Sequence, residues 1–102
     1  EVTANITVGE LTQKVIDTWG SGSWKDISTN ANFHEATLLS LDISKARHRL
    51  KWRPTLTLDE TVQFTVNWYK AFMEKKNMYD FCLQQIEQYT ENAFTRGIQW
   101  AK

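Results

Sequence analysis

The sequence predicts one helix-rich domain of the α/β (α+β) class, with four helices and two or three short strands. Three observations lead to this prediction. Apolar residues recur at three- and four-residue spacing in four stretches, at about residues 8–19, 43–50, 58–75 and 78–96. Helix-start signals precede these stretches. Short β-favouring runs lie at residues 2–6, at 24–28, and in the apolar stretch that ends at Leu41.

The first helix is predicted from Val8 to Trp19. Thr7 and Glu10 have the spacing of a capping box, in which each side chain accepts a hydrogen bond from a backbone amide near the other residue. Gly20 follows where a left-handed cap residue is needed. The inner face should contain the apolar residues Val8, Leu11, Val15 and Trp19.

The second helix is short and lies in the segment His34–Pro54. Asp42 is the predicted cap residue, and Pro54 prevents the helix from running further because it lacks a backbone amide. We expect Ile43, Ala46 and Leu50 to form its apolar face, and Trp52 to be buried.

The third and fourth helices follow the same rules. Thr57 and Glu60 form a second capping box, and Asn77 can cap the last helix. The third helix has apolar residues on two faces, which suggests that other elements cover both sides. The fourth helix should turn inward the residues Met78, Phe81, Cys82, Ile86, Tyr89 and Ala93. Arg96-Gly97 is its predicted stop signal, and residues 98–102 are expected to fray.

Composition limits the function classes. Twelve basic and twelve acidic residues give a net charge of zero, so no global field attracts nucleic acid or an anionic membrane. The single cysteine, Cys82, excludes an internal disulfide and suits a reducing compartment. With no apolar run long enough for a membrane helix and no secretory signal, we predict a soluble, cytoplasmic chain.

The sequence contains no catalytic constellation. It has no glycine-rich cofactor loop and no tyrosine followed four residues later by lysine, and its two histidines have no second ligand at metal spacing. Catalytic, cofactor-binding and metal-binding residues are therefore predicted to be absent. Cys82 lies on an apolar face and is interpreted as a core thiol.

The best polar candidates for binding are His34 and Glu35. A histidine can neutralise or hydrogen-bond a diphosphate, and a carboxylate can accept hydrogen bonds from sugar hydroxyls. The alternative is a solvated pair with no ligand. A second candidate is the run of five basic residues from Lys45 to Arg53, which could contact nucleic acid or form the solvated side of a short helix. We favour the solvated side.

Several residues carry a resemblance to a known family. Asp42, Lys45, Ala46, Leu50, Trp52 and Pro54 resemble a C-terminal signature of the extended short-chain dehydrogenases that modify nucleotide-sugars. His34-Glu35-Ala36, Val8-Gly9-Glu10-Leu11, Trp68-Tyr69-Lys70 and Gln85-Ile86-x-x-Tyr89 look most like the CDP-glucose 4,6-dehydratase family. One departure is Lys51, where the family usually has glycine.

The resemblance implies a function for the chain. Members of this family use tightly bound NAD to convert CDP-glucose to a 4-keto-6-deoxy sugar, for cell-surface polysaccharide such as O-antigen. Residues 1–102 would be the C-terminal substrate-binding cap, with His34 and Glu35 facing the nucleotide-sugar, and the NAD-binding Rossmann domain would be absent. The parent enzyme is expected to be a homo-oligomer, with neither nucleic acid nor membrane as a partner.

The abundance of aromatic residues keeps a second hypothesis open. Aromatic residues make up 13% of the chain, and so much aromatic surface is hard to bury in 102 residues. Together with Glu1 in place of an initiator methionine, this suggests a piece of a larger protein. The alternative is a stand-alone helical domain whose surplus aromatic residues bind a protein partner without catalysis.

Overall fold

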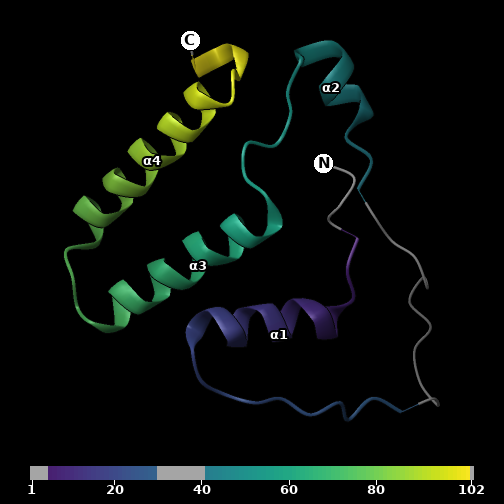
Figure 1. Ribbon diagram of the computed structural model, residues 1–102, viewed down its shortest axis with the longest axis vertical. Coiled ribbons are helices and arrows are strands. Elements are labelled where there is room, and N and C mark those ends of the chain that lie inside the picture. Colours follow the sequence, from purple (N-terminus) through teal and green to yellow (C-terminus); the bar gives the residue numbers. More distant parts are fainter. Residues whose placement is uncertain (1–4, 30–40, 102) are drawn as a thin grey trace.

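The computed structural model describes residues 5–29 and 41–101, and the regular elements within them are helices (Figure 1). The elements are α1 (Val8–Trp19), α2 (Ser44–Leu50), α3 (Leu58–Met73), α4 (Met78–Thr95) and the 3-10 turn η2 (Gln99–Ala101). The described ranges contain no strand. The predicted α/β class is therefore wrong, whereas the four predicted helices are confirmed to within two residues at each end.

The strand predicted at Trp24–Ser28 is replaced by irregular chain. A strand needs a neighbouring strand to satisfy its backbone groups, and the described residues offer none. Instead, Asp26 accepts hydrogen bonds from the Ser28 amide at 2.8 Å and the Ser28 hydroxyl at 2.5 Å. The strands predicted at residues 2–6 and before Leu41 lie mostly outside the described residues.

Trp24 is held against the first helix. Its indole Nε1 donates to Gln13 Oε1 at 3.0 Å. A Cβ atom at Gly9 would lie only 3.0 Å from the Trp24 ring, so a larger residue at position 9 would push this ring away. Gly9 therefore allows the close approach of the Trp24 ring to α1.

Three helices begin as the sequence predicts. The Thr7 amide donates to Glu10 Oε2 at 2.6 Å and the Glu10 amide donates to Thr7 Oγ1 at 3.1 Å, which completes the capping box of α1. Thr57 and Glu60 make the same pair of bonds at 2.9 and 3.2 Å. The Asn77 side chain accepts from the Asp80 amide at the start of α4.

The start of α2 differs from the prediction. Its cap residue is Ile43, which makes no side-chain capping bond. Asp42 accepts from the amide and hydroxyl of Ser44, two residues further on, so it forms a local turn just before the helix. These two bonds, the hydroxyl bond first, lower the pKa of Asp42.

The end of α2 explains why glycine suits position 51. Lys51 has φ 54°, in the left-handed region that residues with a Cβ atom rarely adopt. The Trp52 amide then donates to the Ala46 carbonyl at 3.3 Å, as in a Schellman cap.

We expect Lys51→Gly to raise the free energy of unfolding by about 1 kcal/mol, because glycine adopts this conformation without steric cost. Urea denaturation followed by circular dichroism would measure the change. Lys51→Ala is the control, since it removes the same charge but keeps the strained Cβ. If Lys51→Ala stabilised the chain as much as Lys51→Gly, the gain would come from the charge and not from the backbone.

Helix α3 is the centre of the described fold. It packs against α1 on one side and α4 on the other, which confirms that both of its apolar faces are used (Figure 1). The buried apolar residues are Val62, Val66 and Ala71 on α3, Ala93 on α4, and Ile98 beyond it. Val62 and Val66 share a face of α3 with Asp59 and Lys70, which contact α1, so the buried residues lie on both sides of α3.

Polar contacts fix α1 against α3. Lys14 Nζ forms an ion pair with Asp59 at 2.7 Å. Lys70 Nζ donates to the Trp19 carbonyl at 2.7 Å and lies 5.3 Å from the centroid of the Trp19 ring. A cation is favourable there because the last carbonyls of a helix carry partial negative charge.

The C-terminal residues do not fray as predicted. Gly97 adopts φ 68°, which reverses the chain direction, and the Ile98 amide donates to the Ala93 carbonyl at 2.9 Å. Ile98 is then only 5% exposed. The Trp100 ring stacks on Tyr89 with 6.0 Å between centroids. Residues 98–101 are therefore part of the fold.

The predicted burial of several large side chains is wrong. Trp52 is 41% exposed, and Ile86 is 60% exposed while its neighbour Gln85 takes the inner position on α4. Val8 and Leu50 also lie open to solvent. Helical spacing identifies which residues share a face, but whether that face is covered depends on what packs there.

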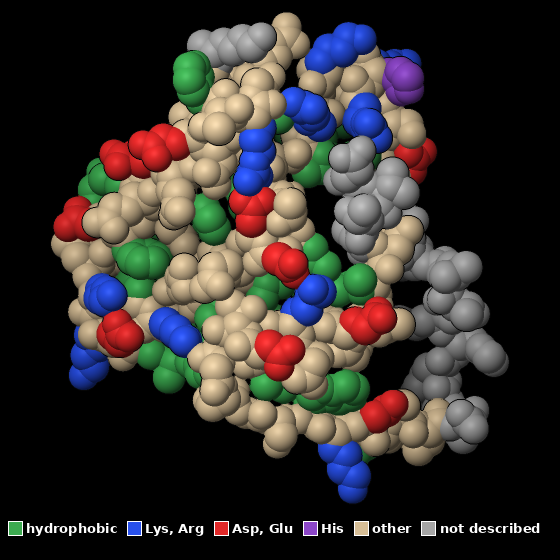
Figure 2. Space-filling model, in the orientation of Figure 1, with side chains coloured by type: hydrophobic (Ala, Val, Ile, Leu, Met, Phe, Trp, Pro, Cys, Tyr) green, Lys and Arg blue, Asp and Glu red, His purple; other side chains and the backbone are tan. Residues whose placement is uncertain are grey.

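The molecule is flat and exposes much apolar surface. Its extents are 51 × 41 × 18 Å and its radius of gyration is 17.1 Å, compared with about 13 Å for a compact domain of this length. Figure 2 shows hydrophobic side chains reaching the surface between the polar ones. The small core around α3 thus leaves surface that suits contact with another protein part.

Candidate functional site

The two predicted binding residues, His34 and Glu35, lie outside the described residues. Their role in binding remains a prediction. The described chain stops at Thr29 on one side of them and resumes at Leu41 on the other. A functional site within the described residues must therefore be built from other side chains.

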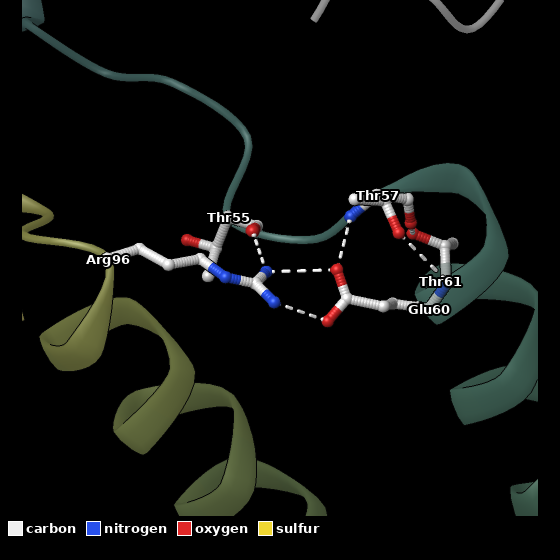
Figure 3. A network of polar contacts seen from close by, with 5 residues as sticks. All are labelled: Thr55, Thr57, Glu60, Thr61 and Arg96. Atoms are coloured by element: carbon white, nitrogen blue, oxygen red, sulfur yellow. Dashed lines mark hydrogen bonds and ion pairs between the residues drawn. The ribbon is translucent and has the colours of Figure 1, made fainter.

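The most connected polar group joins the start of α3 to the end of α4 (Figure 3). We call Thr55, Thr57, Glu60 and Arg96 the Arg96 cluster. Arg96 Nη1 donates to the Thr55 carbonyl at 2.6 Å and to Glu60 Oε1 at 3.0 Å, and Nη2 donates to Glu60 Oε2 at 2.6 Å. This two-pronged contact fixes the guanidinium plane against the carboxylate.

The electrostatics of the cluster follow from these bonds. Hydrogen bonding from Arg96, and then from the Thr57 amide, lowers the pKa of Glu60 to about 2. The Glu60 carboxylate in turn raises the pKa of Arg96. Both side chains are charged at neutral pH, and each oxygen of the Glu60 carboxylate accepts a hydrogen bond from Arg96. The Arg96 cluster is therefore a structural clamp and not an acid–base pair.

A shallow aromatic depression lies between α3 and α4. Its volume is about 310 Å³, and its lining residues are Phe64, Thr65, Trp68, Tyr69 and Gln85. Trp68 Nε1 donates to Cys82 Sγ, Gln85 Nε2 donates to the Phe64 carbonyl, and the Thr65 hydroxyl donates to the Thr61 carbonyl. Because these donors are already used, the depression offers few polar groups to orient a sugar or a nucleotide.

The basic segment around α2 is on the surface. Lys45, Arg47, Arg49, Lys51 and Arg53 are all exposed, which agrees with the interpretation of a solvated helix side. Arg53 differs from the others because its Nη2 donates to the Arg96 carbonyl at 3.0 Å. It therefore links the chain after α2 to the end of α4.

The described residues do not fit the remaining classes of site. They contain no group of three or more His, Cys, Asp or Glu side chains placed to bind a metal ion. Cys82 is half-buried beside Trp68, which suits the predicted core thiol. None of the helices in the described ranges has the length and apolarity of a membrane span.

NAD also does not fit the described residues. A dinucleotide phosphate is usually bound by free amides at the start of a helix. In α1 and α3 two of these amides at each helix start donate to the side chains of the capping box, and Glu10 and Glu60 place a carboxylate there. An added phosphate there would meet negative charge.

Sequence reasoning missed the partners that complete the Arg96 cluster. Arg96 was predicted only as part of the stop signal of the last helix, and the buried Thr55 was not singled out. The capping box of Thr57 and Glu60 is a local signal, but Arg96 is 36 residues further along the chain. No local pattern predicts that contact.

Comparison with known proteins gives one match and two negative results. The chain is 32% identical over 83 residues to the CDP-glucose 4,6-dehydratase of Salmonella typhimurium. The match covers 81% of this chain but 23% of that enzyme, so the chain spans less than a quarter of its relative's length. No protein-family model matches the chain. No solved structure matches it. The chain is thus a distant, partial relative of a nucleotide-sugar dehydratase.

Proposed function

We propose that this chain is the C-terminal substrate-binding portion of an NAD-dependent nucleotide-sugar dehydratase, most specifically a CDP-glucose 4,6-dehydratase. Such an enzyme converts CDP-glucose to CDP-4-keto-6-deoxyglucose and water. The observation that carries the proposal is the 32% identity over 83 residues to a dehydratase of that name. Residues 1–102 would form one substrate-binding subdomain of a cytoplasmic, homo-oligomeric enzyme.

The proposal assigns substrate binding to this chain and NAD binding to a separate domain. NAD supplies the hydride acceptor for oxidation of the sugar, and the described residues do not fit it. The carboxylates at the starts of α1 and α3, and the absence of a glycine-rich loop from the sequence, support this division. This chain would then bind and orient the nucleotide-sugar without performing the chemistry, and alone it would be inactive.

His34 and Glu35 are proposed to contact the nucleotide-sugar. An imidazole N–H can donate a hydrogen bond to a diphosphate oxygen, with added Coulomb attraction when the ring is protonated. The Glu35 carboxylate can accept hydrogen bonds from sugar hydroxyls.

We expect His34→Ala, in the full-length enzyme that contains this chain, to raise the KM for CDP-glucose by roughly tenfold, the effect of losing one charge-assisted hydrogen bond. Steady-state kinetics would measure it. His48→Ala is the matched control, because His48 is the other histidine and lies exposed on α2. Unchanged KM and kcat for His34→Ala would remove His34 from the site.

The proposal as a whole has a separate test. The 102-residue chain alone should form no 4-keto sugar from CDP-glucose and NAD, and the full-length enzyme should form it. If the full-length protein acted only on other nucleotide-sugars, the CDP-glucose assignment would fail while the dehydratase class would stand. Turnover by the chain alone would contradict the proposed division of work.

A second candidate function is a stand-alone helical interaction domain. The observation that favours it is the exposure of large apolar side chains such as Phe72 at 57% and Met73 at 68%. The length of the native protein separates the two candidates. A reading frame that continues upstream through a glycine-rich loop would exclude the stand-alone domain.

A further inference from the structure

The three long helices form a single layer. Figure 1, viewed along the shortest axis of 18 Å, shows α1, α3 and α4 with α3 in the middle, and α3 contacts both of the others. Helices α1 and α3 run in nearly the same direction, and α4 runs back. A folded domain needs two packed layers to bury an apolar core. The composition of the two broad sides of this layer therefore indicates where a second layer belongs.

The two open sides of α3 differ in character. The side of α3 that contacts α1 is fixed by the Asp59 ion pair, and the side that contacts α4 is fixed by Trp68, which donates to a sulfur on α4. Between these sides, the helical positions place Gln63 and Asn67 on one open side, and Thr65, Tyr69 and Phe72 on the other. One open side of α3 is thus polar and the other is mainly aromatic.

The exposed apolar residues of α1 and α4 continue the aromatic side of α3. Residues advance around every helix in the same right-handed sense, so the running directions of the helices fix which residues share a side of the layer. With α1 parallel to α3 and α4 antiparallel to it, the residues on the side of Tyr69 and Phe72 are Val8, Val15, Tyr79, Leu83, Ile86 and Phe94. Their exposed fractions range from 39% at Val15 to 82% at Val8. We call these eight residues the open apolar face.

The open apolar face carries no charged residue. None of its eight members is Asp, Glu, Lys or Arg. The opposite side of the layer is polar, with Asp17 on α1, Asn67 on α3 and Gln88 on α4 all exposed. An uncharged face leaves water without the cost of desolvating an ion. Such a face is typical of a permanent contact and not of one that alternates between bound and free.

The aromatic depression opens on the same side of the layer. Thr65 and Tyr69 line it from α3, and Gln85, the neighbour of Ile86, lines it from α4. The Thr65 hydroxyl and the Gln85 amide already donate to backbone carbonyls of α3. The depression therefore suits a protruding apolar side chain of a covering protein surface better than a sugar.

We propose that the open apolar face packs against the NAD-binding domain of the same polypeptide. This inference rests on the proposed function, which supplies that domain. The match covers 23% of the dehydratase relative, so most of an enzyme of that length lies outside it and could form the second layer. A covalently attached domain covers the face at all times, whereas a separate partner would leave a large apolar surface in water before binding.

Cysteine accessibility in the full-length protein tests the burial of this face. Tyr69→Cys and Ile86→Cys lie on the open apolar face, and Asn67→Cys and Gln88→Cys are their matched controls, two residues away on the polar side. We expect a maleimide to label the first two at least about tenfold more slowly in native protein than in urea, and the controls within about threefold. Mass spectrometry of the peptides measures each rate.

Photo-cross-linking identifies the occupant. Replacing Phe72 with p-benzoylphenylalanine keeps an aromatic ring there, so the native contact should survive. The full-length protein is prepared from isotopically light and heavy chains that have exchanged subunits. We expect cross-links from position 72 to peptides outside residues 1–102, with the same isotope in both joined peptides. The same replacement at Asn67 is the control and should give none of these cross-links.

The other outcomes overturn the inference or the proposed function separately. Cross-links between a light and a heavy chain would show that a second copy covers the face. Cross-links only to other proteins, or rapid labelling at Tyr69 and Ile86, would also exclude the NAD-binding domain as the occupant. A dehydratase with a freely labelled face would retain the proposed function and lose this inference. Same-chain cross-links in a protein that forms no 4-keto sugar would retain the contact and exclude the dehydratase.

Discussion

Replacing Ile98 with alanine is expected to lower the free energy of unfolding of the chain by about 2–4 kcal/mol. Ile98 is one of few buried apolar residues, and its amide donates to the Ala93 carbonyl at the end of α4. Removing three carbon atoms leaves a cavity beside Ala93, which is fully buried and too small to fill the space. Urea denaturation followed by far-ultraviolet circular dichroism measures the loss.

Ile27→Ala is the matched control for this experiment. It deletes the same atoms from a side chain that is 82% exposed, so its effect should stay within about 0.5 kcal/mol. If the two variants were equally stable, residues 98–101 would contribute nothing to the fold, and the tail would behave as the sequence alone suggested.

The tail shows where sequence reasoning fails. Arg96-Gly97 was correctly interpreted as the end of a helix, and Gly97 does adopt a left-handed conformation. The path of the chain after this turn depends on a surface formed by residues of α4, where Trp100 stacks on Tyr89. A five-residue tail has no periodicity of its own, so its burial could not be predicted from local pattern.

Local signals predicted local structure well. The capping boxes of α1 and α3 and the left-handed Gly20 depend on residues within four positions of one another, and all are confirmed. The strand at 24–28 was wrong because a strand is not a local structure. It requires a neighbour, and β-favouring residues alone do not supply one.

Only part of the candidate site could be predicted from the sequence. His34 and Glu35 were selected by chemistry and by family resemblance, and they lie outside the described residues, so their assignment is still a prediction. The contact between Glu60 and Arg96 could not be predicted, because it depends on how α3 and α4 pack. Ile86 on α4 was predicted on the inner face but is 60% exposed, because spacing does not show what covers a face.

The Arg96 cluster should make the stability of the chain depend on pH. The folded pKa of Glu60 is about 2, below its ordinary value of 4.5. A lowered carboxylate pKa means that the ionised form stabilises the fold. That contribution is complete above about pH 4.5 and is lost as the pH falls toward about 2.

We therefore expect Glu60→Gln to lower the free energy of unfolding by about 1–2 kcal/mol at pH 7, less than the full pKa shift implies because the pair is partly solvent-exposed. The difference between the two proteins should shrink as the pH falls from about 4.5 to about 2. Urea denaturation at a series of pH values measures both quantities.

Glu10→Gln is the control that distinguishes the stabilising effect of the Arg96 contact from that of the capping box. Glu10 closes the equivalent box at the start of α1, and the hydrogen bond from the Thr7 amide lowers its pKa, but no arginine donates to it among the described contacts. Its replacement should therefore cost less and give a smaller change with pH. Equal effects for the two variants would mean that the capping bond, and not the contact with Arg96, accounts for the stabilising role of Glu60.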